Sequence, residues 1–159
     1  MTCNRLHAAA DQWVLGALHE EDLSAVAIEA LEEGLDSPKL RMLAGWTLAS
    51  ALDPQRLFRD ALEESGVALR SRDQILRERA LPVVQAVAKN ELHVSLLAET
   101  LNRAVGTDVT SSNSPLYSLW CYACDFHCEE RYRTLFEDLA KKEALTLLQR
   151  FESADPLFC

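Results

Sequence analysis

The chain has 159 residues, the size of one domain, and 48% hydrophobic residues with only 5 Gly and 5 Pro exclude a disordered or collagen-like protein. Its 25 Asp and Glu against 16 Lys and Arg give a formal net charge of -9, which disfavours binding to nucleic acid or to an anionic membrane and favours a basic partner. No apolar run is long enough for a leader or a membrane anchor, so we expect a cytoplasmic protein whose 5 cysteines stay reduced.

Helical periodicity is clear after residue 22. A first predicted helix carries Glu29, Glu32 and Glu33 off its apolar stripe, and Gly34 supplies its C-terminal stop. The stripe has apolar residues at the helical spacing i, i+3, i+4, i+7 and i+8: Leu23, Val26, Ala27, Ala30 and Leu31.

Two helices opened by proline follow. Asp36 or Ser37 is placed to cap the first of them, and Pro38 stands where a missing N–H costs nothing. Asp53 and Pro54 repeat this arrangement for the second helix. Its predicted buried face and its stop are Leu57, Phe58, Ala61, Leu62 and then Gly66.

The next predicted helix contains a proline. Ser71 is its candidate cap, and Pro82 lies inside it, where the lost backbone donor predicts a kink or an interruption. Its apolar residues are Ile75, Leu76, Val83, Val84 and Val87.

The remainder of the chain also reads as helix. One stripe after Asn90 ends at Gly106 and contains Leu92, Leu96, Leu97, Leu101 and Val105. Residues 107–115 form the main predicted loop, and residues 153–159 form a tail. Core candidates between them are Leu135, Phe136, Leu139, Leu147, Leu148 and Phe151. The sequence therefore predicts an all-α protein with residues 1–159 in a single domain, an irregular bundle of about six to eight antiparallel helices.

The segment WCYACDFHC, residues 120–128, is the richest in reactive side chains. Cys121, Cys124 and Cys128 share one helical face, which favours packing as small apolar side chains. Residues seven apart on a helix are separated by about 10 Å of rise, too far for two thiolates on one zinc ion. A subset of Cys124, His127 and Cys128 is the alternative metal or redox site, and it needs a ligand from elsewhere.

No catalytic motif is recognisable. His7, His19 and His93 are scattered, and serines 111, 112 and 114 fall in the predicted loop without a nucleophile elbow. The tryptophans, which are Trp13, Trp46 and Trp120, are predicted core anchors. The sequence thus predicts a protein that is not an enzyme and holds no cofactor or metal.

Acidic residues gather in several clusters, and one of them is the predicted partner-binding site. It consists of Glu29, Glu32, Glu33 and Asp36, beside the capped turn at Ser37. A rigid helix end is well placed to present such charges to a basic protein, although a solvated helical surface has the same composition.

Four stretches resemble a loosely defined group of small bacterial helical proteins of unassigned function. They are AIEALEEGLDSPKLRMLAGW, LFRDALEESGV, VVQAVAKNELHVSLLAETLNRAVG and LYSLWCYACDFHCEERYRTLFEDLAKKEALTLLQRF. Members of that group usually lack the cysteines of the last stretch and often have a Gly and a small-residue turn after the position of Leu97. The resemblance implies a bacterial cytoplasmic helical protein without an active site, and some members resemble products of toxin and immunity loci.

Charge and resemblance together predict a non-enzymatic binding protein, similar to an immunity protein or an antitoxin, that sequesters a basic partner such as a toxin. One alternative is an enzyme or metal-binding protein centred on Cys124, His127 and Cys128. Another is a scaffold or regulatory subunit.

Overall fold

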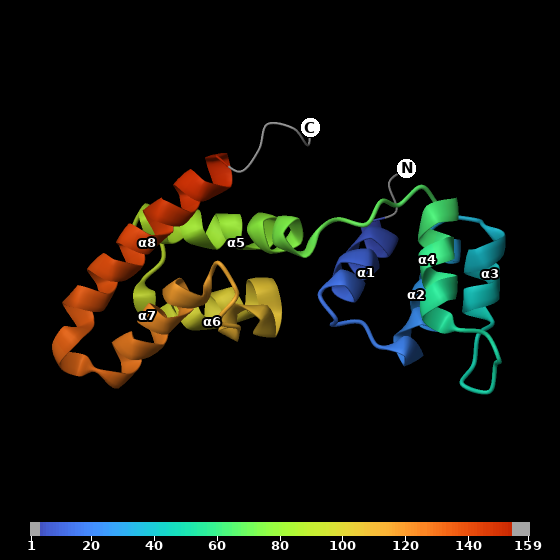
Figure 1. Ribbon diagram of the computed structural model, residues 1–159, viewed down its shortest axis with the longest axis horizontal. Coiled ribbons are helices and arrows are strands. Elements are labelled where there is room, and N and C mark those ends of the chain that lie inside the picture. Colours follow the sequence, from blue (N-terminus) through green and yellow to red (C-terminus); the bar gives the residue numbers. More distant parts are fainter. Residues whose placement is uncertain (1–3, 154–159) are drawn as a thin grey trace. The chain divides into compact units, whose positions relative to one another are not determined.

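The computed structural model describes residues 4–153 and shows the all-α fold that the sequence predicts (Figure 1). Those residues form eight α-helices and three short 3-10 helices, with no strand among them. They fall into two compact units, Met1–Arg72 and Asp73–Cys159. The single domain over residues 1–159 stays a prediction. The predicted tail 153–159 lies outside the described residues except for Ser153.

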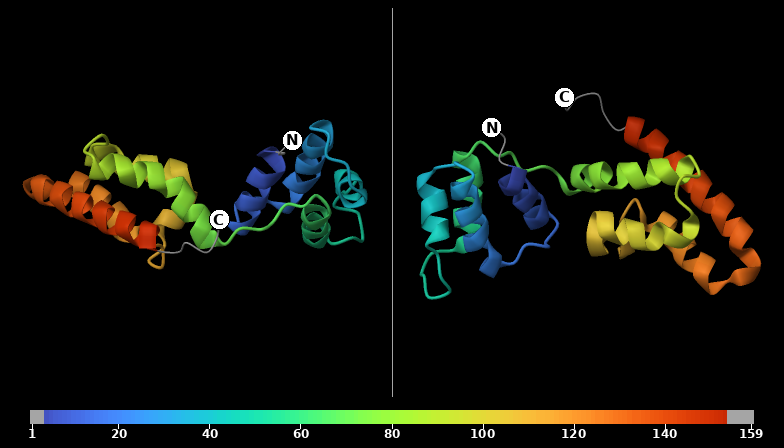
Figure 2. Two further views of the ribbon diagram at one scale, coloured as in Figure 1. Left: turned by 90° about the horizontal axis from the view of Figure 1, so that it is seen from above. Right: turned by 180° about the vertical axis from the view of Figure 1, so that it is seen from behind.

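The first unit is built from neighbouring antiparallel helices. Its elements are α1 (Asn4–Val14), the 3-10 helix η1 (Glu20–Asp22), α2 (Leu23–Glu32), α3 (Pro38–Ala44) and α4 (Pro54–Glu64). Ser24 at the start of α2 donates to the carbonyl of Ala44 at the end of α3 over 2.8 Å. The Lys39 N–H at the start of α3 donates to Glu64 Oε2 at the end of α4 over 3.0 Å. Helices α2, α3 and α4 therefore run side by side in alternating directions (Figure 2).

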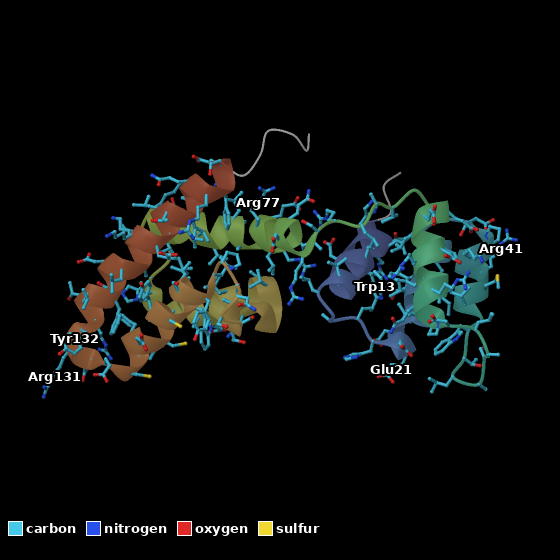
Figure 3. All side chains as sticks on the ribbon, viewed as in Figure 1. Trp13, Glu21, Arg41, Arg77, Arg131 and Tyr132 are labelled. Atoms are coloured by element: carbon cyan, nitrogen blue, oxygen red, sulfur yellow. The ribbon has the colours of Figure 1, made fainter. Side chains whose placement is uncertain are left out.

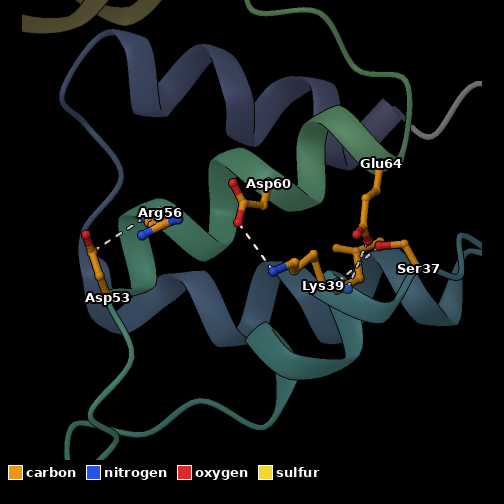
Figure 4. A network of polar contacts seen from close by, with 7 residues as sticks. Ser37, Lys39, Asp53, Arg56, Asp60 and Glu64 are labelled. Atoms are coloured by element: carbon orange, nitrogen blue, oxygen red, sulfur yellow. Dashed lines mark hydrogen bonds and ion pairs between the residues drawn. The ribbon is translucent and has the colours of Figure 1, made fainter.

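Local side-chain bonds explain where α3 and α4 begin. Of the two caps left open by the sequence, Ser37 is the one used, since its hydroxyl accepts from the Leu40 N–H over 3.2 Å. Asp53 accepts from the Gln55 N–H over 3.0 Å, so the predicted cap of α4 is confirmed. Figure 4 shows both caps together with the ion pair of 3.4 Å between Lys39 Nζ and Asp60 Oδ2, which joins the two helices.

The two predicted glycine stops of the first unit are confirmed by their geometry. At the end of α2, Gly34 has φ 89°, and the N–H groups of Gly34 and Leu35 bond back to the carbonyls of Leu31 and Ala30. Gly66, with φ 70°, makes the equivalent turn after α4. A side chain at these left-handed positions is strained, which is why glycine stands there.

The core of the first unit follows the predicted stripes. Phe58 is fully buried, and the predicted core anchor Trp46 is 9% exposed. Trp13 packs against this core with its ring edge-on to Phe58, their centroids 6.0 Å apart. The buried residues are Leu6, Ala9, Ala10, Leu23, Ala27, Ala30, Leu40, Leu43, Trp46, Leu57, Phe58, Ala61, Leu62 and Val67.

The second unit contains four longer helices: α5 (Arg72–Ala88, whose first residue closes the first unit), α6 (Val94–Val105), α7 (Tyr117–Cys128) and α8 (Arg133–Ser153). Helix α5 continues through Pro82, so the predicted interruption is wrong, whereas a bend there stays a prediction. Proline removes one backbone donor, and burial of the five predicted apolar residues of α5 holds the helix on both sides of it. The predicted loop 107–115 starts as a 3-10 helix, η2 (Gly106–Thr110), and is irregular only beyond it.

Several core predictions in the second unit are wrong. Leu96 and Leu135 are 54% and 50% exposed, although Leu96 belongs to a predicted apolar stripe and Leu135 is a predicted core residue. On α8 the fully buried residues are Ala140, Ala144 and Leu147. Small side chains let neighbouring helices approach closely, so the larger leucines next to them are pushed to the margin of the core.

Candidate partner-binding surface

The predicted acidic site lies at the C-terminal end of α2 and in the link to α3. Glu29 and Glu33 both face Arg5 of α1, with N···O distances of 2.8 and 3.2 Å. Asp36 forms a two-bond pair with Arg41 of α3, one bond of which is 2.7 Å long. Glu32 is the one of the four for which no ion pair is found among the described residues.

These ion pairs change the electrostatics of the site. Hydrogen bonding to Glu29 raises the pKa of the Arg5 guanidinium, and hydrogen bonding to Arg41 lowers the pKa of the Asp36 carboxyl. Three glutamates also stand at the end of α2 where the helix dipole is negative, and Arg5 offsets part of that repulsion. Much of the charge of this cluster is therefore balanced within the protein before a partner arrives.

A second acidic group was not singled out from the sequence as a site. Helix η1 consists of Glu20, Glu21 and Asp22, all exposed, and it leads into the opposite end of α2. Gln55 Nε2 donates to Glu20 Oε1 over 2.7 Å, which holds η1 against the first turn of α4. For Glu21 and Asp22 no ion pair is found among the described residues, so their charge is available to a partner.

The same end of the first unit exposes apolar side chains on the link between α3 and α4. Leu48 is 82% exposed and Leu52 is 50% exposed. The sequence signal was present, because two leucines stand in the short stretch between Gly45 and the cap Asp53. A leucine in so short a link belongs to no helical stripe, so helical periodicity does not single it out.

The cysteine-rich face of α7 is not the core face, which corrects the packing prediction. Cys121 and Cys124 are half-buried and Cys128 is exposed. The buried residues of α7 and its N-cap are Leu116, Leu119, Ala123 and Phe126. The two stripes lie roughly 150° apart around the helix, on nearly opposite sides of it.

The predicted core anchor Trp120 is half-buried, stacked on Tyr117 at 6.3 Å between ring centroids. Its Nε1 is buried without a hydrogen-bond partner among the described residues. Trp120 thus packs at the margin of the core rather than at its centre.

The alternative metal site is not assembled in the described part of the chain. No three His, Cys, Asp or Glu side chains gather there at distances suited to a metal ion. His127 Nε2 bonds instead to the carbonyl of Ser95, 2.8 Å away on α6. Cys3 and Cys159 lie outside the described residues.

Thiol chemistry should differ between neighbouring cysteines of α7. Burial raises the pKa of the Cys124 thiol, and the charges of Cys121 and Asp125 add to this effect, whereas Cys128 is exposed. We expect iodoacetamide to modify Cys128 several-fold faster than Cys124, because the thiolate is the reactive form. Tandem mass spectrometry of the labelled peptide separates the sites, and labelling in urea should remove the difference. Equal rates in the folded protein would contradict this environment of Cys124.

His93 joins α6 to α8. Its Nδ1 lies 2.8 Å from Ser95 Oγ and accepts from the Ser95 N–H over 3.2 Å, while Nε2 lies 3.1 Å from Glu137 Oε1. A hydroxyl, an imidazole and a carboxylate that contact one another in series resemble the catalytic triad of a hydrolase. Here, however, the Nδ1 lone pair also caps the helix, and the side chains of His93 and Glu137 are 59% and 42% exposed. Helix capping therefore explains the arrangement of these side chains. His93, Glu137 and Lys141 also help to line a cavity of about 360 Å³.

Loss of this cap should destabilise the protein. We expect His93→Ala to lower the free energy of unfolding by about 1 kcal/mol, the usual worth of a helix cap. His93→Asn, which keeps a side-chain acceptor at the N-cap of α6, should recover most of it. Urea unfolding followed by circular dichroism measures both variants. An alanine variant as stable as the wild type would show that the imidazole does not serve as a cap.

Two further findings concern membrane-spanning helices and similarity to known proteins. Among the described residues no helix is long and apolar enough to cross a membrane. Comparison with protein-family models, with curated proteins and with solved structures finds no match to this sequence.

Proposed function

We propose that the protein is a non-enzymatic binding protein that holds a basic partner protein, in the manner of an immunity protein or an antitoxin. The observation that carries the proposal is the pair of exposed carboxylates of Glu21 and Asp22, for which no ion pair is found in the described part of the chain, in a chain of net charge -9. Fixed negative charge on a helical scaffold accelerates encounter with a basic protein and selects against acidic ones.

The four-residue cluster of Glu29, Glu32, Glu33 and Asp36 stays a prediction as the contact site. A partner that binds there has to compete with Arg5 and Arg41 for three of the four carboxylates. Exchange of one exposed ion pair for another yields little net free energy. We therefore expect this cluster to contribute more to the association rate than to the lifetime of the complex.

The experiment is isolation of the partner from the native host, followed by stopped-flow measurement of association at several salt concentrations. The proposal expects a partner with a pI above neutrality and an association rate that falls steeply with ionic strength. The quadruple variant Glu29→Lys, Glu32→Lys, Glu33→Lys, Asp36→Lys should slow association if the cluster is used. An acidic partner, or an association rate insensitive to salt, would refute the proposed function.

A further inference from the structure

The link between α3 and α4, residues 45–53, is an unusual place for leucines. At 82% Leu48 is the most exposed large hydrophobic side chain among the described residues, and Leu52 is 50% exposed. Met42 in the last turn of α3 adds a third apolar side chain, 44% exposed. Single exposed leucines are common, but apolar side chains gathered on one protruding link are typical of an interaction site.

The link is held in place by its own hydrogen bonds. The buried Trp46 donates from Nε1 to the carbonyl of Leu52 over 3.0 Å. Thr47 donates its N–H to Ser50 Oγ over 3.1 Å, and the Ser50 N–H returns to the Thr47 carbonyl over 2.8 Å. Both leucines are thus displayed by an anchored turn. Little backbone conformational entropy therefore remains to be lost when a partner covers them.

Negative charge stands beside this apolar turn. The bond between Gln55 and Glu20 holds η1 against the first turn of α4, which directly follows the link. Figure 3 shows Glu21 projecting at the end of the first unit where the link also lies. Asp53 at the N-cap of α4 is exposed as well, so a fourth carboxylate follows the link directly. The surface therefore combines an apolar centre with an acidic rim.

We propose that this surface, Leu48 and Leu52 with the rim of Glu20, Glu21 and Asp22, docks a basic amphipathic helix of the partner protein. The leucines cover the apolar face of that helix, and its flanking Lys and Arg side chains pair with the rim. The inference rests on the proposed function and names the contact site and the partner's binding element. A second copy of this chain is a poor occupant, because a symmetric contact brings one acidic rim against the other.

The test uses the full chain and a synthetic peptide of Leu and Lys, about 18 residues long, with leucines at helical spacing. Titration calorimetry should detect binding of this peptide and much weaker binding of a peptide of the same composition without an apolar face. The variant Leu48→Ser, Leu52→Ser should weaken binding at least about tenfold. The matched control Leu96→Ser, Leu145→Ser changes leucines that are 54% and 47% exposed in the second unit, and it should bind as the wild type does.

A charge variant tests the rim separately. Glu21→Lys with Asp22→Lys should weaken binding and flatten its dependence on salt, because two of the attracting carboxylates are reversed. The control is Glu99→Lys with Glu143→Lys in the second unit, which changes the net charge by the same amount. This control should weaken peptide binding less, because it leaves the carboxylates of the rim in place.

Three outcomes would overturn the docking site. They are equal binding by the wild type and the Leu48→Ser, Leu52→Ser variant, equal binding of the two peptides, and self-association of the protein that the leucine changes abolish. Failure of the site is distinguishable from failure of the function. A basic native partner that ignores the leucine changes leaves the proposed function standing and removes the site, whereas an acidic native partner refutes the function whatever the variants do.

Discussion

Replacement of Leu43 by alanine should lower the free energy of unfolding by about 2–5 kcal/mol. Leu43 is fully buried in the core that α2, α3 and α4 share. The substitution removes apolar contacts and leaves a cavity that the antiparallel helices, fixed by capped and glycine-terminated ends, cannot fill by shifting. Urea unfolding monitored by circular dichroism gives the value.

The matched control is Leu48→Ala, the same change five positions later on an exposed side chain. It should alter the free energy of unfolding by less than about 0.5 kcal/mol. Equal losses in the two variants would show that Leu48 is buried in solution. The proposed docking surface would then not exist.

The variant Arg70→Met should cost about 2 kcal/mol of stability. Asp11 in α1 is 7% exposed, and Arg70, shortly before α5, forms a two-bond pair with it, one bond of which is 3.1 Å long. Loss of the guanidinium leaves the Asp11 carboxylate in a place that water reaches poorly. The partial exposure of Arg70, 35% of its side chain, keeps the expected loss below that of a fully buried pair.

Arg41→Met is the comparison variant, because Arg41 makes a similar two-bond pair with Asp36 in which both side chains are more than half exposed. It should leave the urea midpoint almost unchanged, since water solvates both charges once they separate. The double variant Asp11→Asn, Arg70→Met should be more stable than the sum of its single changes predicts. Additive losses would mean that the two residues do not interact.

Local chemistry in the sequence was sufficient to predict the boundaries of α3 and α4. Each begins with a capping side chain followed by proline, and the bonds that define these starts span no more than three residues. The turn that ends α4 at Gly66 is equally local, and a glycine at a left-handed position marks it in the sequence.

Contacts between distant residues escaped prediction. Neither the bond of His127 to Ser95, 32 positions apart, nor the approach of His93 to Glu137 leaves a trace in spacing along the chain. The same holds for the pairing of Arg5 with Glu29 and Glu33, which are also distant from it in sequence. This pairing reduces the charge that the predicted site can offer to a partner. Periodicity locates a helix, but only the packing of its neighbours decides which of its stripes is buried.

Zero-length carbodiimide crosslinking of the full chain to its isolated basic partner is the most direct test of the binding surface. This chemistry joins carboxylates to lysines only where the two are in contact. The account predicts crosslinks from Glu20, Glu21 or Asp22 to lysines of the partner, and their loss in the Leu48→Ser, Leu52→Ser variant. Crosslinks confined to carboxylates of residues 73–153, or crosslinks from η1 that survive the leucine changes, would contradict it.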